Sequence, residues 1–228
     1  MSPARSTGLL LLFSTLVAGN VSVYREIFAP RELEVRVFTT GKSTVLLLHS
    51  PQGTTFLIDT GPDAQILRIL GRTLPEWQRH IDAIILTSVT PRTAGGLPTI
   101  LSNYRVTTLI RPATLGTQSR EVALANLANT EPAMHQIIAR RGMRLMLGGG
   151  VYADILWPPQ EATNLSTVSG GLVVQISYGA TSFLVKESLP PRVEKWLDEH
   201  DKGLPVPDVL IASTTPAHVF FSDGKTIR

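Results

Sequence analysis

Residues 86–97 read Leu-Thr-Ser-Val-Thr-Pro-Arg-Thr-Ala-Gly-Gly-Leu, and no other part of the chain says more about its architecture. The run follows an apolar segment, residues 81–86, which has the pattern of a buried strand. It leads into residues 97–102, which predict a short helix. Proline and paired glycines in between are typical of a loop. The stretch therefore predicts a strand, a loop rich in hydroxyl side chains and a helix.

Before this loop, the pattern predicts antiparallel strands followed by a helix. Residues 33–38 alternate in polarity, and residues 45–49 and 55–59 flank the turn sequence Ser50-Pro51-Gln52-Gly53. The run Thr60-Gly61-Pro62 interrupts the strands. After it, the apolar residues of 64–70 have helical spacing up to Gly71. A further strand is expected at residues 106–110.

After the loop, strands and helices alternate again. The best hairpin is predicted where two strands flank Gly179-Ala180. Residues 119–141 are rich in helix formers and are expected to be helical, with Pro132 dividing them. The other segments are expected as strands at 143–147, 153–157, 172–178, 181–185, 209–212 and 218–221 and a helix at 190–200. Strands interrupted by helices in both halves predict two sheets packed between helical layers.

The N-terminus is the clearest compositional anomaly. Residues 9–18, from Leu9 to Ala18, are almost wholly apolar, and no charge occurs between Arg5 and Arg25. Extended from Thr7 to Val23, this charge-free run is just long enough for a marginal single membrane span, and its leucine-rich centre also suits a secretory signal peptide. An anchor is favoured because no clean Ala-x-Ala cleavage site is present. We predict an anchor or signal segment and linker at residues 1–30 and one domain at residues 31–228.

Composition excludes several kinds of chemistry. The 228 residues contain no cysteine, so disulfides, thiolate metal sites and cysteine nucleophiles are ruled out. A net charge of +3 is only weak support for contact with nucleic acid or anionic lipid. Arg140, Arg141 and Arg144 form the densest basic group. A solvated helix surface is the favoured interpretation of this group, and a phosphate-contacting patch is the alternative.

From residue 33 to the C-terminus, the chain resembles the metallo-β-lactamase-fold domain of ComEC, the bacterial DNA-uptake (competence) protein. The resemblance rests on the order of short stretches at residues 33–38, 56–62, 81–87, 95–98, 156–159 and 176–184. It implies an α/β fold of four layers, an αββα sandwich, preceded here by one N-terminal hydrophobic helix. It also implies a domain outside the cytoplasm of a bacterial cell, held at the cell membrane by the N-terminal span, or secreted if the N-terminus is cleaved.

The resemblance also shows where this chain departs from the family pattern. The family loop His-x-His-x-Asp-His falls on Ser88, Thr90, Arg92 and Thr93. Near residues 39–44 both family acids are lost, and the late Pro-His-His-Gly-Ser becomes residues 213–217, Ser-Thr-Thr-Pro-Ala. The vestigial site positions implied by the resemblance are Asp59, Ser88, Thr90, Arg92, Thr93, Glu187 and Thr214.

These replacements bear on the chemistry. Zinc sites use imidazole, thiolate and carboxylate ligands, and a guanidinium repels a divalent cation. We therefore predict no metal, no cofactor and no catalytic residues, because a hydrolase of this kind needs metal-bound hydroxide. Asp59 is the acid that stays in place, and capping of the following helix explains it without a metal.

The remaining candidate residues give little support for a metal site, a nucleotide site or a nucleophile. The five histidines are scattered without ligand spacing, and only His218 with Asp223 or Glu187 forms a combination worth inspection. Residues 41–44 imitate the end of a Walker A loop, but Arg36 occupies the position of its first glycine. Ser88 has no nearby histidine or lysine in the sequence to activate it as a nucleophile.

Two hypotheses for function follow. The first is a non-catalytic, membrane-tethered, extracytoplasmic binding or scaffold module linked to DNA uptake, with DNA or a membrane channel protein as partner. Its anion-binding residues would be Arg92, Arg111, Arg140, Arg141 and Arg144. The second is an active metal-dependent phosphodiesterase or nuclease with an atypical site, in which zinc or manganese would be recruited by Asp59, Glu187 or His218. The oligomeric state is left open.

Overall fold

A computed structural model describes residues 32–41, 43–113, 133–159, 170–187, 190–200, 208–213 and 218–221. The chain divides into two units, Met1–Glu32 and Leu33–Arg228. The predicted N-terminal hydrophobic helix lies outside the described residues. Within the part that is described, no helix has the length and apolar character needed to cross a membrane.

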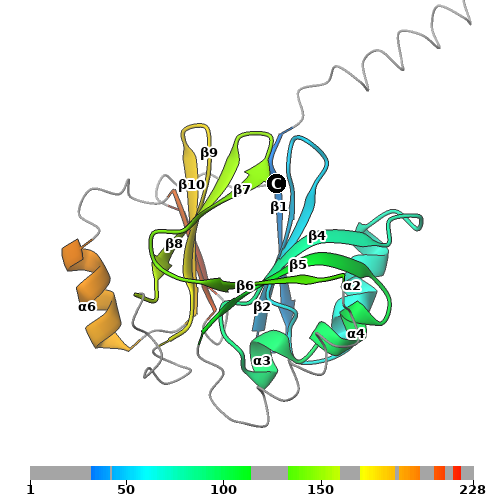
Figure 1. The fold of residues 1–228 in the computed structure, drawn as a ribbon, viewed down its shortest axis with the longest axis horizontal. Coiled ribbons are helices and arrows are strands. Elements are labelled where there is room, and N and C mark those ends of the chain that lie inside the picture. Colours follow the sequence, from blue (N-terminus) through cyan, green and yellow to red (C-terminus); the bar gives the residue numbers. More distant parts are fainter. Residues whose placement is uncertain are drawn as a thin grey trace, which may run out of the picture. The chain divides into compact units, whose positions relative to one another are not determined.

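The first sheet has six strands in the order in which they occur along the chain (Figure 1). The strands β1, β2 and β3 pair antiparallel, whereas β3 to β6 pair in parallel. Their bounds are β1 (Glu34–Thr40), β2 (Ser43–His49), β3 (Thr55–Ile58), β4 (His80–Ile85), β5 (Arg105–Pro112) and β6 (His135–Ala139). The helices described in this half are α2 (Gln65–Thr73), α3 (Pro91–Ala94) and α4 (Leu97–Leu101).

The second sheet also has six strands, in the order β12-β11-β10-β9-β8-β7. Among its described strands, β10 and β11 alone pair in parallel, and α6 (Pro191–His200) lies between them in the chain, as a parallel connection requires. The bounds are β7 (Arg144–Gly148), β8 (Val151–Trp157), β9 (Val173–Tyr178), β10 (Thr181–Glu187), β11 (Val209–Ser213) and β12 (His218–Phe221). The predicted hairpin around Gly179, which has a φ of 59°, is confirmed as β9 and β10.

Three apolar clusters define the layers. Leu46 and Ile58 of the first sheet pack with Ile155 and Ile176 of the second. On its other face, the first sheet packs Val45, Leu47 and Leu57 against the buried side chains of α2 and α4. Val193 of α6 packs against Trp157 and Val173 of the second sheet. The order is helices, sheet, sheet, helix, which confirms the predicted αββα sandwich.

One predicted helix is wrong where the structure describes it. Within residues 119–141, positions 119–132 lie outside the described residues, and His135–Ala139 forms β6. This segment pairs in parallel with β5, and its β-branched Ile137 packs on the core between the sheets. Strand pairing and burial therefore override the local helix propensity. Arg140 and Arg141 consequently lie between β6 and β7, and Arg144 begins β7, so this basic group is not on a helix surface.

Candidate functional site

The loop after β4 and the residue after β3 meet at one end of the first sheet. Because β3 and β4 are parallel, Asp59 and Thr87 both follow carboxyl ends of neighbouring strands. The Asp59 amide donates to the carbonyl of Ile85 at 2.8 Å, which extends the pairing beyond the strands. We call Asp59, Thr87, Ser88, Thr90 and Thr93 the hydroxyl cluster.

The Asp59 carboxylate is held by Thr87. One oxygen accepts the Thr87 amide at 2.8 Å and the other accepts the Thr87 hydroxyl at 2.6 Å. Asp59 is 2% exposed and has a φ of 59°, a left-handed conformation that aspartate tolerates better than most residues. The predicted role of Asp59 as a helix cap is wrong. The helix α2 begins later, with Ala64 at its N-cap and no side-chain cap, and Asp63 instead accepts the Gln65 amide at 2.8 Å.

The other hydroxyls of the cluster bond to one another. Thr93 Oγ1 lies 2.9 Å from Thr90 Oγ1 and 3.1 Å from Ser88 Oγ, and it donates to the Ser88 carbonyl at 2.5 Å. Thr90 is the N-cap of α3, and with Thr93 it forms a capping box. Ser88 and Thr93 are each 1% exposed. At the positions where the family resemblance places ligands, the side chains thus stabilise the turn into α3.

The same loop is anchored to its neighbours through backbone carbonyls. The Thr93 carbonyl accepts the Thr60 amide at 2.7 Å and the Thr60 hydroxyl at 2.9 Å, and the Arg92 carbonyl accepts the Ser43 hydroxyl at 2.7 Å. A Cβ at Gly95 would lie 2.1 Å from the Pro62 carbonyl oxygen, so only glycine allows this approach. Sequence reasoning missed Thr60 and Ser43 as anchors, and it missed Thr87 as the partner of Asp59. A hydroxyl residue directly after a predicted strand does not indicate its hydrogen-bond partner, because the partner depends on the register of the neighbouring strands.

Several predicted site positions are only partly described. Glu187 ends β10 and pairs in register with Ser213, but its side chain lies outside the described part. His218 begins β12, again without a described side chain. Thr214 and Asp223 lie outside the described residues altogether. The combination of His218 with Glu187 or Asp223 therefore stays a prediction.

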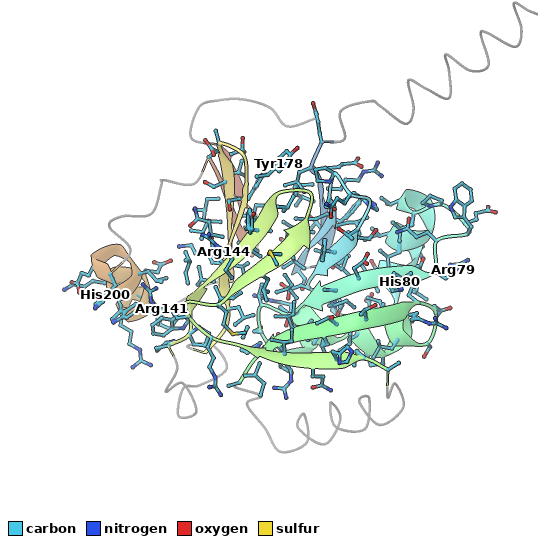
Figure 2. The ribbon with its side chains drawn as sticks, turned by 45° about the horizontal axis from the view of Figure 1, so that its top comes forward. Arg79, His80, Arg141, Arg144, Tyr178 and His200 are labelled. Carbon is cyan, nitrogen blue, oxygen red and sulfur yellow. The ribbon has the colours of Figure 1, made fainter. Side chains whose placement is uncertain are left out.

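The arginines proposed for anion binding differ in the partners that the structure gives them. Arg141 and Arg144 are labelled in Figure 2. Arg144 forms two hydrogen bonds to Asp154, at 2.6 and 2.9 Å, and this bond to a carboxylate raises the pKa of its guanidinium. Arg141 donates to the Leu156 carbonyl at 2.7 Å and lies over the Trp196 ring. Arg111 donates to Gln136 at 3.3 Å and to the Pro112 carbonyl at 3.1 Å.

The strand register nevertheless brings part of this set to one end of the first sheet. Arg111 pairs with Ile138, so Arg111 and the exposed Arg140 lie at adjacent carboxyl ends of β5 and β6. Arg92, on α3, follows the carboxyl end of β4. Three cationic side chains thus come from the sheet end that also carries the hydroxyl cluster.

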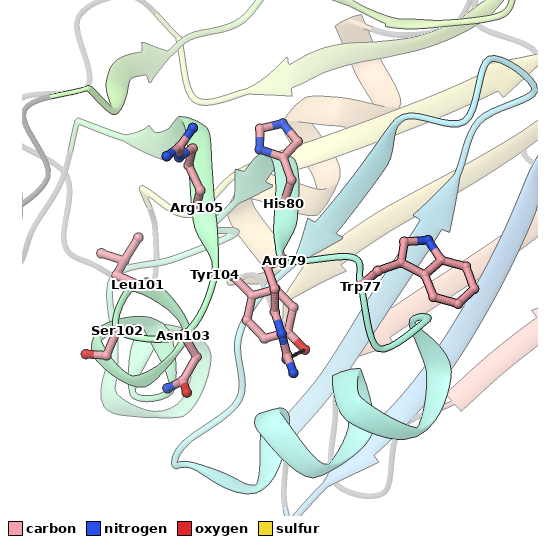
Figure 3. A pocket seen from close by; sticks show the side chains of 8 residues that line it. All are labelled: Trp77, Arg79, His80, Leu101, Ser102, Asn103, Tyr104 and Arg105. Atoms are coloured by element: carbon pink, nitrogen blue, oxygen red, sulfur yellow. Dashed lines mark hydrogen bonds between the residues drawn. The ribbon is translucent and has the colours of Figure 1, made fainter.

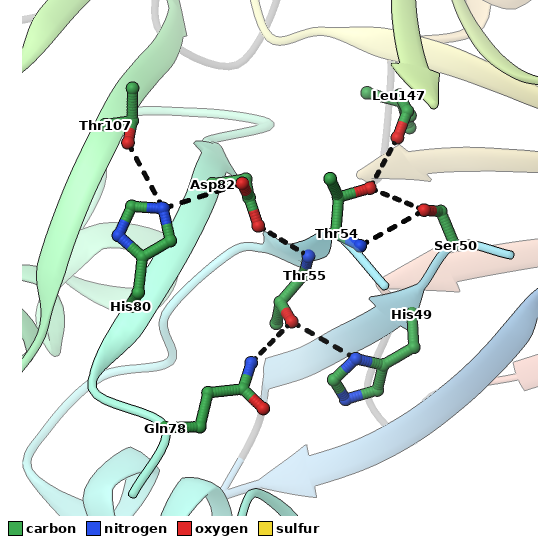
Figure 4. A network of polar contacts seen from close by, with 9 residues as sticks. All are labelled: His49, Ser50, Thr54, Thr55, Gln78, His80, Asp82, Thr107 and Leu147. Carbon is green, nitrogen blue, oxygen red and sulfur yellow. Dashed lines mark hydrogen bonds and ion pairs between the residues drawn. The ribbon is translucent and has the colours of Figure 1, made fainter. Parts of the chain in front are cut away.

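A second polar network lies at the opposite end of the same sheet (Figure 4). The Asp82 carboxylate accepts the Thr55 amide at 2.7 Å and lies 3.5 Å from His80. Gln78 donates to the Thr55 hydroxyl at 2.7 Å, and that hydroxyl lies 3.1 Å from Nδ1 of His49. Burial lowers the pKa of His49, more than the nearby Glu34 raises it. Sequence reasoning found no ligand spacing around either histidine. The partner of His49 lies on another strand, whereas His80 and Asp82 both lie on β4.

Comparison with known proteins supports the fold. No family model matches the chain, and no curated protein matches it by sequence. A metallo-β-lactamase from Cronobacter sakazakii matches with a TM-score of 0.55 and 18% identity, covering 80% of this chain and 75% of that one. The metallo-β-lactamase-fold protein YhfI from Bacillus subtilis matches with a TM-score of 0.53 and 13% identity, covering 79% and 70%. The chain has the metallo-β-lactamase fold.

PqqB from Methylobacterium extorquens, in a Zn²⁺-bound structure, matches with a TM-score of 0.52 and 13% identity, covering 74% of this chain and 59% of that one. In the hydroxyl cluster here, the Asp59 carboxylate accepts two hydrogen bonds from Thr87, and the other side chains of the cluster are neutral hydroxyls. Zinc is bound in proteins by imidazole, thiolate or carboxylate. In the described part of the chain, no group of three or more histidine, aspartate or glutamate residues is close enough to hold a metal ion. The described side chains of the cluster therefore do not fit zinc.

Proposed function

We propose that this protein is a non-catalytic domain of the ComEC type, which acts outside the cytoplasm as a binding or scaffold module linked to DNA uptake. The observation that carries the proposal is the hydrogen bonding of the hydroxyl cluster. Ser88, Thr90 and Thr93 bond to one another, and Asp59 bonds to Thr87, where a hydrolase would direct its ligands at a metal. The proposed role is binding, with no bond broken.

The chemistry of hydrolysis supports the same conclusion. Metallohydrolases obtain their nucleophile by lowering the pKa of metal-bound water to near neutrality. A serine or threonine hydroxyl needs a neighbouring base to replace it. The described partners of Ser88 Oγ are the hydroxyls of Thr90 and Thr93, neither of which is a base.

The location of the arginines supports an anionic partner. Arg92, Arg111 and Arg140 come from the sheet end that carries the hydroxyl cluster. Arginine contacts phosphate groups through several N–H donors in a fixed plane. A cationic loop at this sheet end suits DNA better than it suits a divalent cation. The membrane tether is proposed from residues 9–18 of the sequence.

Elemental analysis tests the non-catalytic proposal. Purified full-length protein, exchanged into chelator-treated buffer and then offered zinc or manganese, is expected to retain well below one equivalent of either. No phosphodiesterase turnover sensitive to chelator is expected. Stoichiometric metal, or turnover that disappears on adding chelator, would overturn the proposal and favour an active metal-dependent phosphodiesterase.

DNA binding at low ionic strength tests the partner. Arg92→Glu and Arg140→Glu are expected to weaken binding and to flatten its dependence on salt. Arg68→Glu makes the same charge change on the exposed face of α2 and serves as the control. Equal affinity in all variants would refute these arginines as contacts.

Fractionation of cells tests the tether. The full-length protein is expected in the membrane fraction, with the domain open to protease added from outside the cytoplasm. Leu12→Arg, which places a charge in the apolar run, is expected to release it. A soluble full-length protein inside the cell would contradict this part of the proposal.

A further inference from the structure

A basic pocket opens at the end of the first sheet opposite the hydroxyl cluster (Figure 3). It has a volume of about 650 Å³ and lies at the amino ends of β4 and β5. Its lining residues are Trp77, Arg79, His80, Leu101, Ser102, Asn103, Tyr104 and Arg105. Neither the fold nor the proposed role of the hydroxyl cluster accounts for this combination of arginines and aromatic rings.

The arginines of the pocket are held next to each other by the backbone. The Arg105 amide donates to the Arg79 carbonyl at 2.9 Å. The Arg79 guanidinium lies 5.5 Å from the centre of the Tyr104 ring, and one of its nitrogens is 3.4 Å from the Tyr104 hydroxyl. Tyr104 is 4% exposed, so it forms a rigid platform that orients Arg79.

The second arginine keeps its hydrogen-bonding capacity. Arg105 pairs in register with His80, which places both at the starts of neighbouring strands. Within the described part of the chain, the Arg105 side chain forms no hydrogen bond or ion pair. The nearby Asp82 carboxylate is engaged by the Thr55 amide and by His80. The residues that line the pocket include no acid, so its cationic donors are not paired with a carboxylate of the lining.

An aromatic ring stands beside these cations in solvent. Trp77, on the connection between α2 and β4, is 85% exposed, which is unusual for the largest apolar side chain. In Figure 3 its indole extends from the same connection as Arg79 and is not packed on Tyr104. An exposed ring next to arginines is the arrangement with which proteins stack a base while they hold its phosphate.

We propose that this pocket binds a segment of single-stranded nucleic acid, with phosphates at Arg79 and Arg105 and a base stacked on Trp77. This inference rests on the proposed binding role and adds a contact surface to it, on the far end of the sheet from Arg92. A strand is favoured over a free nucleotide because the Trp77 ring lines the pocket and is nevertheless 85% exposed, so a base stacked on it would stay open to solvent. Small ligands are mostly buried by their sites, whereas an open groove with an exposed stacking ring suits a continuing chain.

Titration of a labelled oligothymidylate against the full-length protein in mild detergent tests the proposal. At low ionic strength, Arg79→Gln with Arg105→Gln is expected to weaken binding and to reduce the slope of log K against log salt by about 1.4, at roughly 0.7 per lost phosphate contact. Trp77→Ala is expected to weaken it about fivefold or more with little change in that slope. Arg68→Gln with Arg72→Gln removes the same charge from α2 and is expected to change binding much less.

Three further ligands identify the source of the affinity. Each of the three is expected to bind more weakly than the single strand. Duplex DNA of the same sequence lacks accessible bases, a free thymidine nucleotide lacks a continuing chain, and inorganic tripolyphosphate lacks a base. Comparable affinity for any of these three would overturn the inference. Absence of binding to the single strand, or equal losses in the pocket and α2 variants, would also overturn it.

Failure here is distinguishable from failure of the proposed function. If the pocket variants bind like the unaltered chain while Arg92→Glu does not, the pocket is wrong and the binding role stands. If the protein holds stoichiometric metal and cleaves the strand, the non-catalytic proposal fails whatever the pocket variants do. Circular dichroism of Trp77→Ala, an exposed position, confirms that any loss is not caused by unfolding.

Discussion

The two ends of the first sheet use polar side chains in opposite ways. At the carboxyl ends of β3 and β4, Asp59, Ser88 and Thr93 are almost fully buried and bond to residues of the protein. At the amino ends of β4 and β5, Arg79 and Arg105 are exposed around a pocket. In the hydroxyl cluster the polar side chains bond to one another or to the backbone of the protein, whereas the pocket presents arginine donors to solvent.

This difference shows why the position of a site within a fold does not by itself identify the working surface. Buried polar groups are costly unless they are paired, so a buried cluster of hydroxyl side chains is stable only when these side chains bond to one another or to the backbone. The hydroxyl cluster meets that condition. The exposed arginines of the pocket remain solvated, so they do not carry the same cost when a hydrogen bond within the protein is missing.

The largest effect is expected at Asp59. Asp59→Ala should lower the free energy of unfolding by about 3 kcal/mol, because the buried amide and hydroxyl of Thr87 lose a charged acceptor. Urea denaturation measures the change. Asp63→Ala, which removes an exposed carboxylate nearby, should cost much less. Equal losses of unfolding free energy in the two variants would mean that the buried hydrogen bonds of Asp59 contribute no more to stability than an exposed carboxylate does.

A smaller effect is expected at Thr93. Thr93→Val keeps the shape of the side chain and removes the hydroxyl that links Ser88 to Thr90, so a loss of about 1.5 kcal/mol is expected. Thr107→Val, at an exposed position on β5, is the matched control and should be nearly neutral. A neutral Thr93→Val would show that the hydroxyls of the cluster are not needed for stability.

A pH-dependent effect is expected at His49. Because burial lowers the pKa of His49 in the folded protein, the unfolded chain binds the proton more readily once the pH falls below about 6.5. Stability should therefore decline as the pH falls through this range and should be regained as it rises. His49→Gln should flatten this part of a plot of Tm against pH. An unchanged slope would place the dependence on another group.

The smallest effect is expected at the pocket end. Arg105→Gln should change the free energy of unfolding by less than about 0.5 kcal/mol, since its side chain is exposed. Thermal unfolding without ligand provides the measurement. A loss comparable to that of Asp59→Ala would remove the contrast between the two ends and would make Arg105 a structural residue.

Much of the architecture follows from local patterns. The alternation of residues 33–38, the turn at Gly53 and the hairpin around Gly179 all correspond to observed elements. The continuous apolar run of β2 is explained by burial on both faces, with Val45 toward the helices and Leu46 toward the second sheet. The helix expected at residues 135–139 failed because partnership with β5 outweighed composition.

The candidate site was predicted less completely. The positions Ser88, Thr90 and Thr93 were identified from order and resemblance, but their mutual bonding and the capping box were not. The capping role expected for Asp59 depended on a helix starting closer than it does. The pocket was not anticipated, because Arg79 and Tyr104 are separated in the sequence by β4, α3 and α4.

The sequence by itself determined the strands through side-chain periodicity and the turns through turn residues. It also determined that the loop after β4 offers no imidazole or thiolate ligand, because histidine and cysteine are absent from that loop. The tertiary structure alone decided that Asp59 bonds to Thr87, that residues 135–139 extend the sheet and that Arg79 lies on Tyr104. The physical reason is the separation along the sequence of the residues that interact. Periodicity is set by neighbours along the chain, whereas the partner of a polar group is set by the register of strands that the sequence keeps far apart.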